Sequence, residues 1–316
     1  MIDEPAAALP VRFDVGDGWL RQHVDRRLVL RALLSMGASP ALAGCASSTT
    51  ATHRSWASGS ATGGSGATAT DRIAARMPGA RVLHGSRVTL VGDVAAAQLQ
   101  VLFTAAERAV GWVSQVWGEP TVAAHAPLTL AAPKTLTEFR ALGGGTGEAG
   151  QIAATTTPSR LIVISPQLTT EVTAEGVVVV LAHELTHAVL GQGGLTGVHH
   201  WVIEGSAEYT AYRPTGLGLA AAAPQLATVV AKGQVPTGPP DDAEFSGSSA
   251  DPQQAYQYAY AYCLFLADRF GLAAFTSFVR AADARSADAF ASAFATSIPR
   301  LSDAYATFLR SRVRAG

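Results

Sequence analysis

The segment "LAHELTHAVLG" (181–191) places two histidines and a glutamate in an otherwise apolar stretch. His183 and His187 are four residues apart, so on a helix they lie on one face, where two imidazoles can bind one metal ion. Glu184 points about 100° round the same helix, where a carboxylate can hold a water molecule beside that ion. Because buried polar groups need partners, the pattern predicts either a zinc site or two core histidines satisfied near a glutamate.

A second segment, "HHWVIEGSAEYTA" (199–211), carries Glu204 and Glu208, which are also four residues apart and share a helical face. Catalytic zinc sites use three protein ligands and leave a fourth position open to water or substrate. Two histidines from the first segment and one glutamate from the second can fill that set.

The two segments together resemble the gluzincin metallopeptidases, especially the peptidase MA-like family, in which H-E-x-x-H is followed by W-h-x-E-G-h-A-E-Y. The matching residues of the second segment are Trp201, Glu204, Gly205, Ala207, Glu208 and Tyr209. The resemblance implies that Glu204 is the third zinc ligand and that Glu208 orients a ligating histidine through its other ring nitrogen. It also implies that Glu184 takes a proton from zinc-activated water and delivers it to the leaving amine.

Other ligand sets can be weighed against the same residues. A metzincin requires H-E-x-x-H-x-x-G-x-x-H, and this chain has Leu190 and Gly193 where that motif has its glycine and its last histidine. His199 or His200 could replace Glu204 as the third ligand, but the two glutamates of the second segment would then be unexplained.

A peptidase also needs a second donor for the oxyanion that develops in the transition state. In the resembling family this donor is often a tyrosine near the start of a helix that ends in glycine about four turns later. Tyr256 matches that place in "YQYAYAYCLFLADRFG", which ends at Gly271. Tyr258, Tyr260 and Tyr262 lie in the same helix, so Tyr256 is either the oxyanion donor or an aromatic packing residue.

The first 70 residues have the pattern of an export signal. Arg26 and Arg27 precede a short apolar run and resemble a twin-arginine signal, and the stretch ending at Cys45 resembles the lipobox of bacterial lipoproteins. The alternative is an ordinary amphipathic helix with a chance Leu-Ala-Gly-Cys. We expect a signal over 1–45, a lipid on Cys45, a flexible Ser/Thr/Gly/Ala tether over 46–70 and a peptidase domain over 71–316.

Hydrophobic periodicity in this domain predicts an α+β, zincin-like fold. Its first half should hold a mixed sheet with a crossing helix, and its second half should be mostly helical and carry the H-E-x-x-H helix. The expected strands are a hairpin over 81–93 and the segments 127–132, 150–157 and 160–165. The expected helices are 94–118, 135–144, 174–191, 201–213, 251–271, 272–283, 287–297 and 299–313. Substrate should add as a strand to an exposed edge near 150–157 or 160–165.

These features predict a zinc-dependent peptidase held at the extracytoplasmic membrane surface by the lipid on Cys45, with a peptide or protein as substrate. An endopeptidase is favoured because the large extra domains of the aminopeptidase branch are missing. The net charge of −1 gives no reason to expect nucleic acid as a partner. The alternatives are a non-catalytic binding lipoprotein and a zinc amidase of cell-wall peptides. Cys263 should be an inert packing residue.

Overall fold

A computed structural model of the chain describes residues 68–145, 152–246, 249 and 251–314. The predicted signal with Cys45, most of the tether and part of the glycine-rich segment 143–150 lie outside these residues. Helix α3 (Ala69–Ala74) begins two residues before the predicted domain start and is capped at its N-terminus by a capping box between Thr68 and Asp71. Within the described ranges, no helix is both long and apolar enough to cross a membrane.

A five-stranded mixed sheet forms the first half, in the spatial order β1-β2-β3-β5-β4. Its strands are β1 (Arg81–His84), β2 (Val88–Gly92), β3 (Leu128–Ala132), β4 (Ala154–Thr156) and β5 (Ile162–Ile164). β1 and β2 form the predicted antiparallel hairpin, β3 lies parallel to β2 and β5, and β4 runs antiparallel to β5. Since β5 has a strand on each side, the expectation that 160–165 forms an exposed edge is wrong. Of the two segments considered for substrate, β4 is the one at an edge of the described sheet, and β1 lies at the opposite edge.

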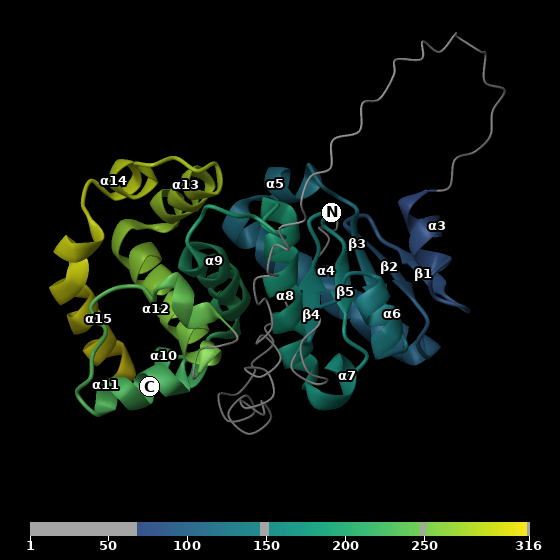
Figure 1. The fold of residues 1–316 in the computed structure, drawn as a ribbon, viewed down its shortest axis with the longest axis horizontal. Helices are drawn as coiled ribbons and strands as arrows, with labels where there is room; N and C mark the ends of the chain where they lie inside the picture. The colour runs from purple at the N-terminus through teal and green to yellow at the C-terminus, as the bar shows by residue number, and fades with distance from the viewer. Residues whose placement is uncertain (1–67, 146–151, 247–248, 250, 315–316) are drawn as a thin grey trace, which may run out of the picture.

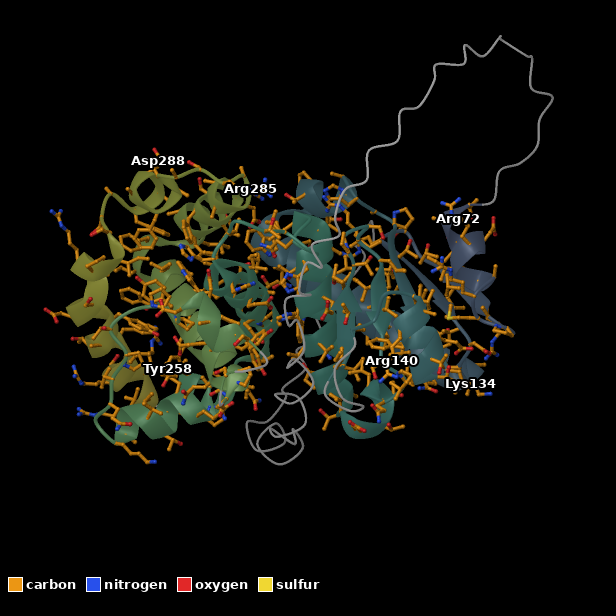
Figure 2. All side chains as sticks on the ribbon, in the orientation of Figure 1. Arg72, Lys134, Arg140, Tyr258, Arg285 and Asp288 are labelled. Atoms are coloured by element: carbon orange, nitrogen blue, oxygen red, sulfur yellow. The ribbon has the colours of Figure 1, made fainter. Side chains whose placement is uncertain are left out.

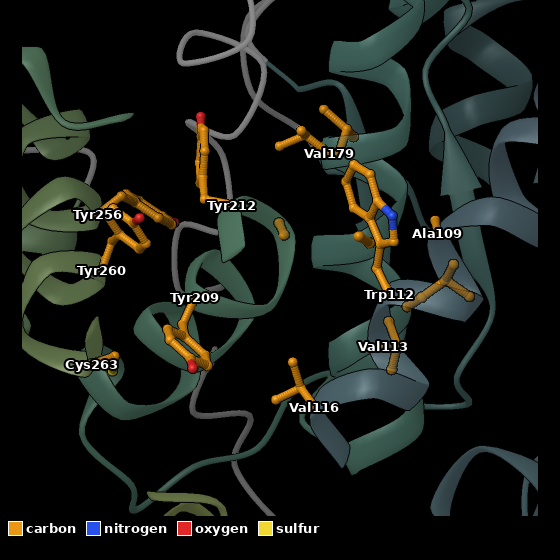
Figure 3. Packing of buried hydrophobic residues seen from close by; sticks show 14 of the residues in the cluster. Ala109, Trp112, Val113, Val116, Val179, Tyr209, Tyr212, Tyr256, Tyr260 and Cys263 are labelled. Atoms are coloured by element: carbon orange, nitrogen blue, oxygen red, sulfur yellow. The ribbon is translucent and has the colours of Figure 1, made fainter. Parts of the chain in front are cut away.

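Both faces of the sheet are covered, which explains its apolar strands. Alternate residues point to opposite faces, and Leu90, Leu130 and Ile162 belong to the main core with helices α4 (Ala96–Trp117) and α8 (Ala174–Leu190). Their neighbours Val91, Ala131 and Val163 form a second core with Phe139 of helix α6 (Leu136–Ala141). Ala109, Trp112, Val113 and Val116 of α4 line its side toward α8 and α9 in Figure 3.

Helix α8 contains four consecutive valines, a residue type that favours strands. The helix nevertheless forms, because it begins at Thr173, whose hydroxyl accepts a hydrogen bond from the Gly176 N–H at 3.2 Å, and ends at Gly191 in the left-handed conformation. Every residue from Gly176 to Val189 is buried. Packing on all sides therefore outweighs the local preference of the valines.

The second half is helical, as predicted, and lies on the other side of α8 from most of the sheet (Figure 1). The predicted helices appear as α9 (His200–Tyr212), α12 (Pro252–Phe270), α13 (Leu272–Asp283), α14 (Ala289–Phe294) and α15 (Ser302–Arg314). Short helices that sequence reasoning missed are α3, α5 (Glu119–Ala123), α7 (Leu168–Glu171), α10 (Leu219–Ala222) and α11 (Pro224–Ala231). Exposed charged side chains such as Lys134, Arg140 and Asp288 lie at the periphery (Figure 2). The α+β fold is confirmed.

Candidate metal centre

Helices α8 and α9 pack against each other and bring His183, His187 and Glu204 into one buried group that could hold a metal ion. The two Nε2 atoms lie 3.0 Å apart, and the Glu204 Oε2 atom lies 3.4 Å from the His183 Nε2 and 3.5 Å from the His187 Nε2. Ligand atoms about 2.0 to 2.1 Å from a tetrahedral metal are separated by about 3.3 Å. The three donors therefore fit a single ion, and within the described residues they are the group that does so.

Close packing of α9 on α12 fixes the position of Glu204. A side chain at Gly205 would place its Cβ 2.7 Å from the carbonyl oxygen of Ala259 and 2.7 Å from the Sγ atom of Cys263. Only glycine lets the two helices approach this closely. Helix packing thus explains why a glycine stands at position 205, which matches the glycine of the family motif. Gly205 directly follows Glu204, a predicted ligand.

The three donors share a strong electrostatic coupling. Burial alone would raise the pKa of Glu204, but attraction to His187 and hydrogen bonds with both histidines hold it at about 2. Burial alone would lower the pKa of His187, and the charge of Glu204 raises it to about 9. The site therefore carries a buried carboxylate anion and draws positive charge toward it, which is the electrostatic setting that a cation requires.

Each histidine has a polar partner behind it. Glu208 lies behind His183, with its Oε1 atom 3.6 Å from Nδ1, on the ring nitrogen that the resemblance assigned to it. Burial raises the pKa of Glu208 to about 7 against the opposing attraction of His183. Gln192 lies behind His187, with Oε1 3.0 Å from Nδ1. Sequence reasoning missed Gln192, although a polar residue directly after the closing glycine of an apolar helix was a signal that could have found it.

Glu184 is 1% exposed and faces the edge strand β4. The Thr156 hydroxyl lies 2.6 Å from the Glu184 Oε2 atom and 2.9 Å from the Glu184 carbonyl oxygen, so its single proton can be donated to either. Burial raises the pKa of Glu184, while the two histidines and Thr156 lower it. The carboxylate is thus tethered to the strand beside the metal group. Sequence reasoning placed the strand but gave no role to Thr156.

Tyr256 is buried on α12 and its ring lies 5.3 Å from that of Phe245. A pair of tyrosines, Tyr212 of α9 and Tyr260 of α12, has ring centroids 5.4 Å apart (Figure 3). Burial and then the charge of Glu208 raise the pKa values of Tyr212 and Tyr260. The role of Tyr256 as oxyanion donor stays a prediction.

The alternative ligands His199 and His200 lie at the start of α9 and contact Asp242. The His199 Nδ1 atom is 3.3 Å from the Asp242 Oδ2 atom, and the His200 N–H donates to Oδ1 at 2.8 Å. Asp242 therefore caps the helix. Neither histidine is part of the group formed with Glu204.

Comparison of the chain with protein-family models and with curated proteins finds no match.

Proposed function

We propose that the protein is a zinc-dependent peptidase of the gluzincin, peptidase MA-like type. The observation that carries the proposal is the fit of His183, His187 and Glu204 to one tetrahedral ion, with Glu184 buried next to it in the chain. Two imidazoles and one carboxylate suit zinc better than calcium or magnesium, which prefer oxygen ligands. Three protein ligands leave a position for water or substrate, as catalysis requires.

The roles of the side chains follow from their places. When bound, zinc supplies a Lewis acid that polarises a scissile carbonyl and lowers the pKa of water. Glu184 accepts a proton from the attacking water and returns it to the leaving amine. Thr156 holds the Glu184 carboxylate by its hydrogen bond of 2.6 Å, and Glu208 supports the His183 ring. Tyr256 is proposed as the donor to the oxyanion.

The proposed substrate is a peptide or protein bound in extended form along β4. Antiparallel pairing of β4 with β5 supports this, since in the described sheet β4 is the last strand beside α8. Backbone pairing to such an edge orients a peptide without reading its sequence. An endopeptidase is favoured over an aminopeptidase.

The setting we propose is the extracytoplasmic surface of the cell membrane. The twin-arginine-like segment at Arg26 and the lipobox-like segment ending at Cys45 support export and lipid attachment, and the Ser/Thr/Gly/Ala-rich residues that follow support a flexible tether. The net charge of −1 gives no support for nucleic acid as a partner.

The test is cleavage of an unbiased peptide library by the full chain loaded with zinc, compared with E184Q. The variant should keep its zinc and lose activity by roughly 10²- to 10⁴-fold, because general base catalysis contributes that much. E175Q changes a glutamate at the start of the same helix, where it pairs with Arg108, and should cleave normally. A chain that binds no zinc, or an E184Q variant as active as wild type, refutes the proposal. Zinc binding without cleavage of any peptide would also refute it and would favour a binding protein.

A further inference from the structure

A buried chain of hydrogen bonds leads from His187 to a second helix. The His187 Nδ1 atom lies 3.0 Å from the Gln192 Oε1 atom, and the Gln192 Nε2 atom donates to Asp283 at 2.9 Å (Oδ2) and 3.2 Å (Oδ1). Asp283 is the last residue of α13, and Gln192 follows α8. Gln192 is 3% exposed, so neither end of its amide can be satisfied by bulk water.

Glycines on both sides of Gln192 make this position possible. Gly191 has a φ of 74°, and a Cβ at Gly193 would lie 2.4 Å from the carbonyl oxygen of Thr157. The chain therefore turns sharply after α8 and presses against the end of β4, which directs the Gln192 side chain back beneath His187. The position of Gln192 is built into the backbone.

The polarity of this chain of hydrogen bonds is fixed by its last member. Both carboxylate oxygens of Asp283 lie within hydrogen-bond distance of the Gln192 Nε2 atom, at 2.9 Å and 3.2 Å, and a carboxylate only accepts hydrogen bonds. The NH₂ group of Gln192 must then face Asp283, and its carbonyl oxygen must face His187. A carbonyl oxygen only accepts, so Nδ1 of His187 must carry the proton. The lone pair of Nε2 is thereby directed at the group formed with His183 and Glu204.

We propose that Gln192 and Asp283 form a positioning relay that fixes the ring orientation and the tautomer of His187, with Nε2 presented as a metal ligand. The metal part of this inference rests on the proposed function. Glu208 faces His183 directly at an ion-pair distance of 3.6 Å, which is too long for a hydrogen bond, whereas Asp283 acts on His187 through hydrogen bonds to an amide, so the two proposed ligands have chemically different partners. The Ser206 Oγ atom can also accept from the Gln192 nitrogen, but at 3.5 Å it is the weaker contact.

An exchange of the two side-chain types tests the relay. In the Q192E/D283N double variant the carboxylate at position 192 still accepts from His187, and the second hydrogen bond is reversed, since the new amide at position 283 donates to that carboxylate. Each contact therefore keeps one donor and one acceptor, and His187 keeps its acceptor. The Q192E single variant instead places two carboxylates face to face. We expect zinc affinity, measured in the full chain by competition with a chelator, to fall by roughly 10- to 100-fold in Q192L and Q192E. The zinc affinity of the double variant should recover to within about threefold of wild type. The zinc affinity of S206A, the matched control, should also stay within about threefold of wild type.

The second readout does not need metal. The pKa of His187 in the metal-free chain is raised to about 9, so the tautomer is read from ¹⁵N NMR spectra recorded at a pH above that value, where the ring is neutral. There the His187 ring should carry its proton on Nδ1 in wild type and in Q192E/D283N. In Q192L the ring should lose this preference. The relay is overturned by a proton on Nε2 in wild type, by a Q192L variant that binds zinc as wild type does, or by a double variant no better than Q192E. A wild-type chain that binds no zinc refutes the proposed function, and the tautomer of His187 then decides the relay alone.

Discussion

The substitution E204Q separates the ligands of the metal centre from the residues around it. Glu204 supplies the one carboxylate of the group, and its Oε2 atom lies 3.4 and 3.5 Å from the two histidine nitrogens. The glutamine has nearly the same shape, so it preserves the packing of α9 against α8. It removes the negative charge and offers at most a neutral oxygen, because its NH₂ group cannot bind a cation.

The size of the effect can be worked from the number of donors. Structural zinc sites with four ligands bind with about 10 to 16 kcal/mol, so one donor accounts for roughly 2.5 to 4 kcal/mol. Three donors of this chain meet the spacing for one ion, so the loss of Glu204 cannot be made good by a spare ligand in the group. We therefore expect E204Q to weaken zinc binding by roughly 10²- to 10³-fold.

The measurement is chelator competition at fixed pH and salt, with E184Q and E208Q as matched variants. E184Q makes the same glutamate-to-glutamine change at the residue next to His183, outside the ligand group, and should bind zinc within about threefold of wild type. E208Q removes the partner behind His183 and should cost roughly tenfold. The ligand assignment is wrong if E204Q binds zinc as tightly as wild type, or if E184Q loses as much affinity as E204Q.

Three further predictions concern residues around the centre. T156V removes the hydroxyl that holds Glu184 and should lower kcat/KM by roughly tenfold at full zinc occupancy. T156S keeps a hydroxyl and should stay near wild type. Equal losses in both variants would argue against the hydrogen bond. Burial raises the pKa of the Cys263 thiol, so in a C45S background a thiol reagent at pH 8 should label Cys263 only after denaturation; labelling of the native chain would contradict its buried position. Because burial raises the folded-state pKa of Asp283 to about 6 from an ordinary 3.8, the folded state holds its proton more tightly than the unfolded state and the metal-free wild type loses stability as pH rises from 4 to 6. D283N should lack this part of the slope and exceed wild type by up to about 3 kcal/mol at pH 7 in denaturant unfolding, and parallel pH profiles would refute this.

The metal group could be predicted because its geometry is local. His183 and His187 are placed by one helical turn, and so are Glu204 and Glu208, so each pair needs only its own helix to be correct. A single tertiary contact, between α8 and α9, then brings His183, His187 and Glu204 together. The prediction of a metal-binding group therefore depended on few assumptions about the fold.

The partners of this group could not be predicted, because they come from elements whose relative places are set by the whole fold. Thr156 reaches Glu184 only because a three-residue strand pairs antiparallel at the sheet edge. Asp283 reaches Gln192 across 91 residues of sequence. Neither contact can be predicted from the hydrophobic periodicity of a single segment.

The missed helices have another cause. α10 and α11 lie in an alanine-rich stretch where an apolar face is poorly marked, although the proline at the start of α11 is a recognised helix signal. α5 is only five residues long. Short helices depend on packing more than on their own sequence, so their boundaries follow from the tertiary structure.

The buried acids of the candidate metal centre are expected to lower the stability of the metal-free fold. Glu184, Glu204 and Glu208 are each at most 3% exposed, and burial raises the pKa values of Glu184 and Glu208. Replacing buried ionic groups by apolar side chains of similar size is often neutral or stabilising by about 1 to 4 kcal/mol. A helix as apolar as α8 would thus lose nothing as a core element if its polar residues were absent. These polar residues lie at spacings that fit one ion, and the stability they cost is what a preorganised metal site is expected to cost. D283N should show that cost directly by stabilising the metal-free fold while weakening the support of His187.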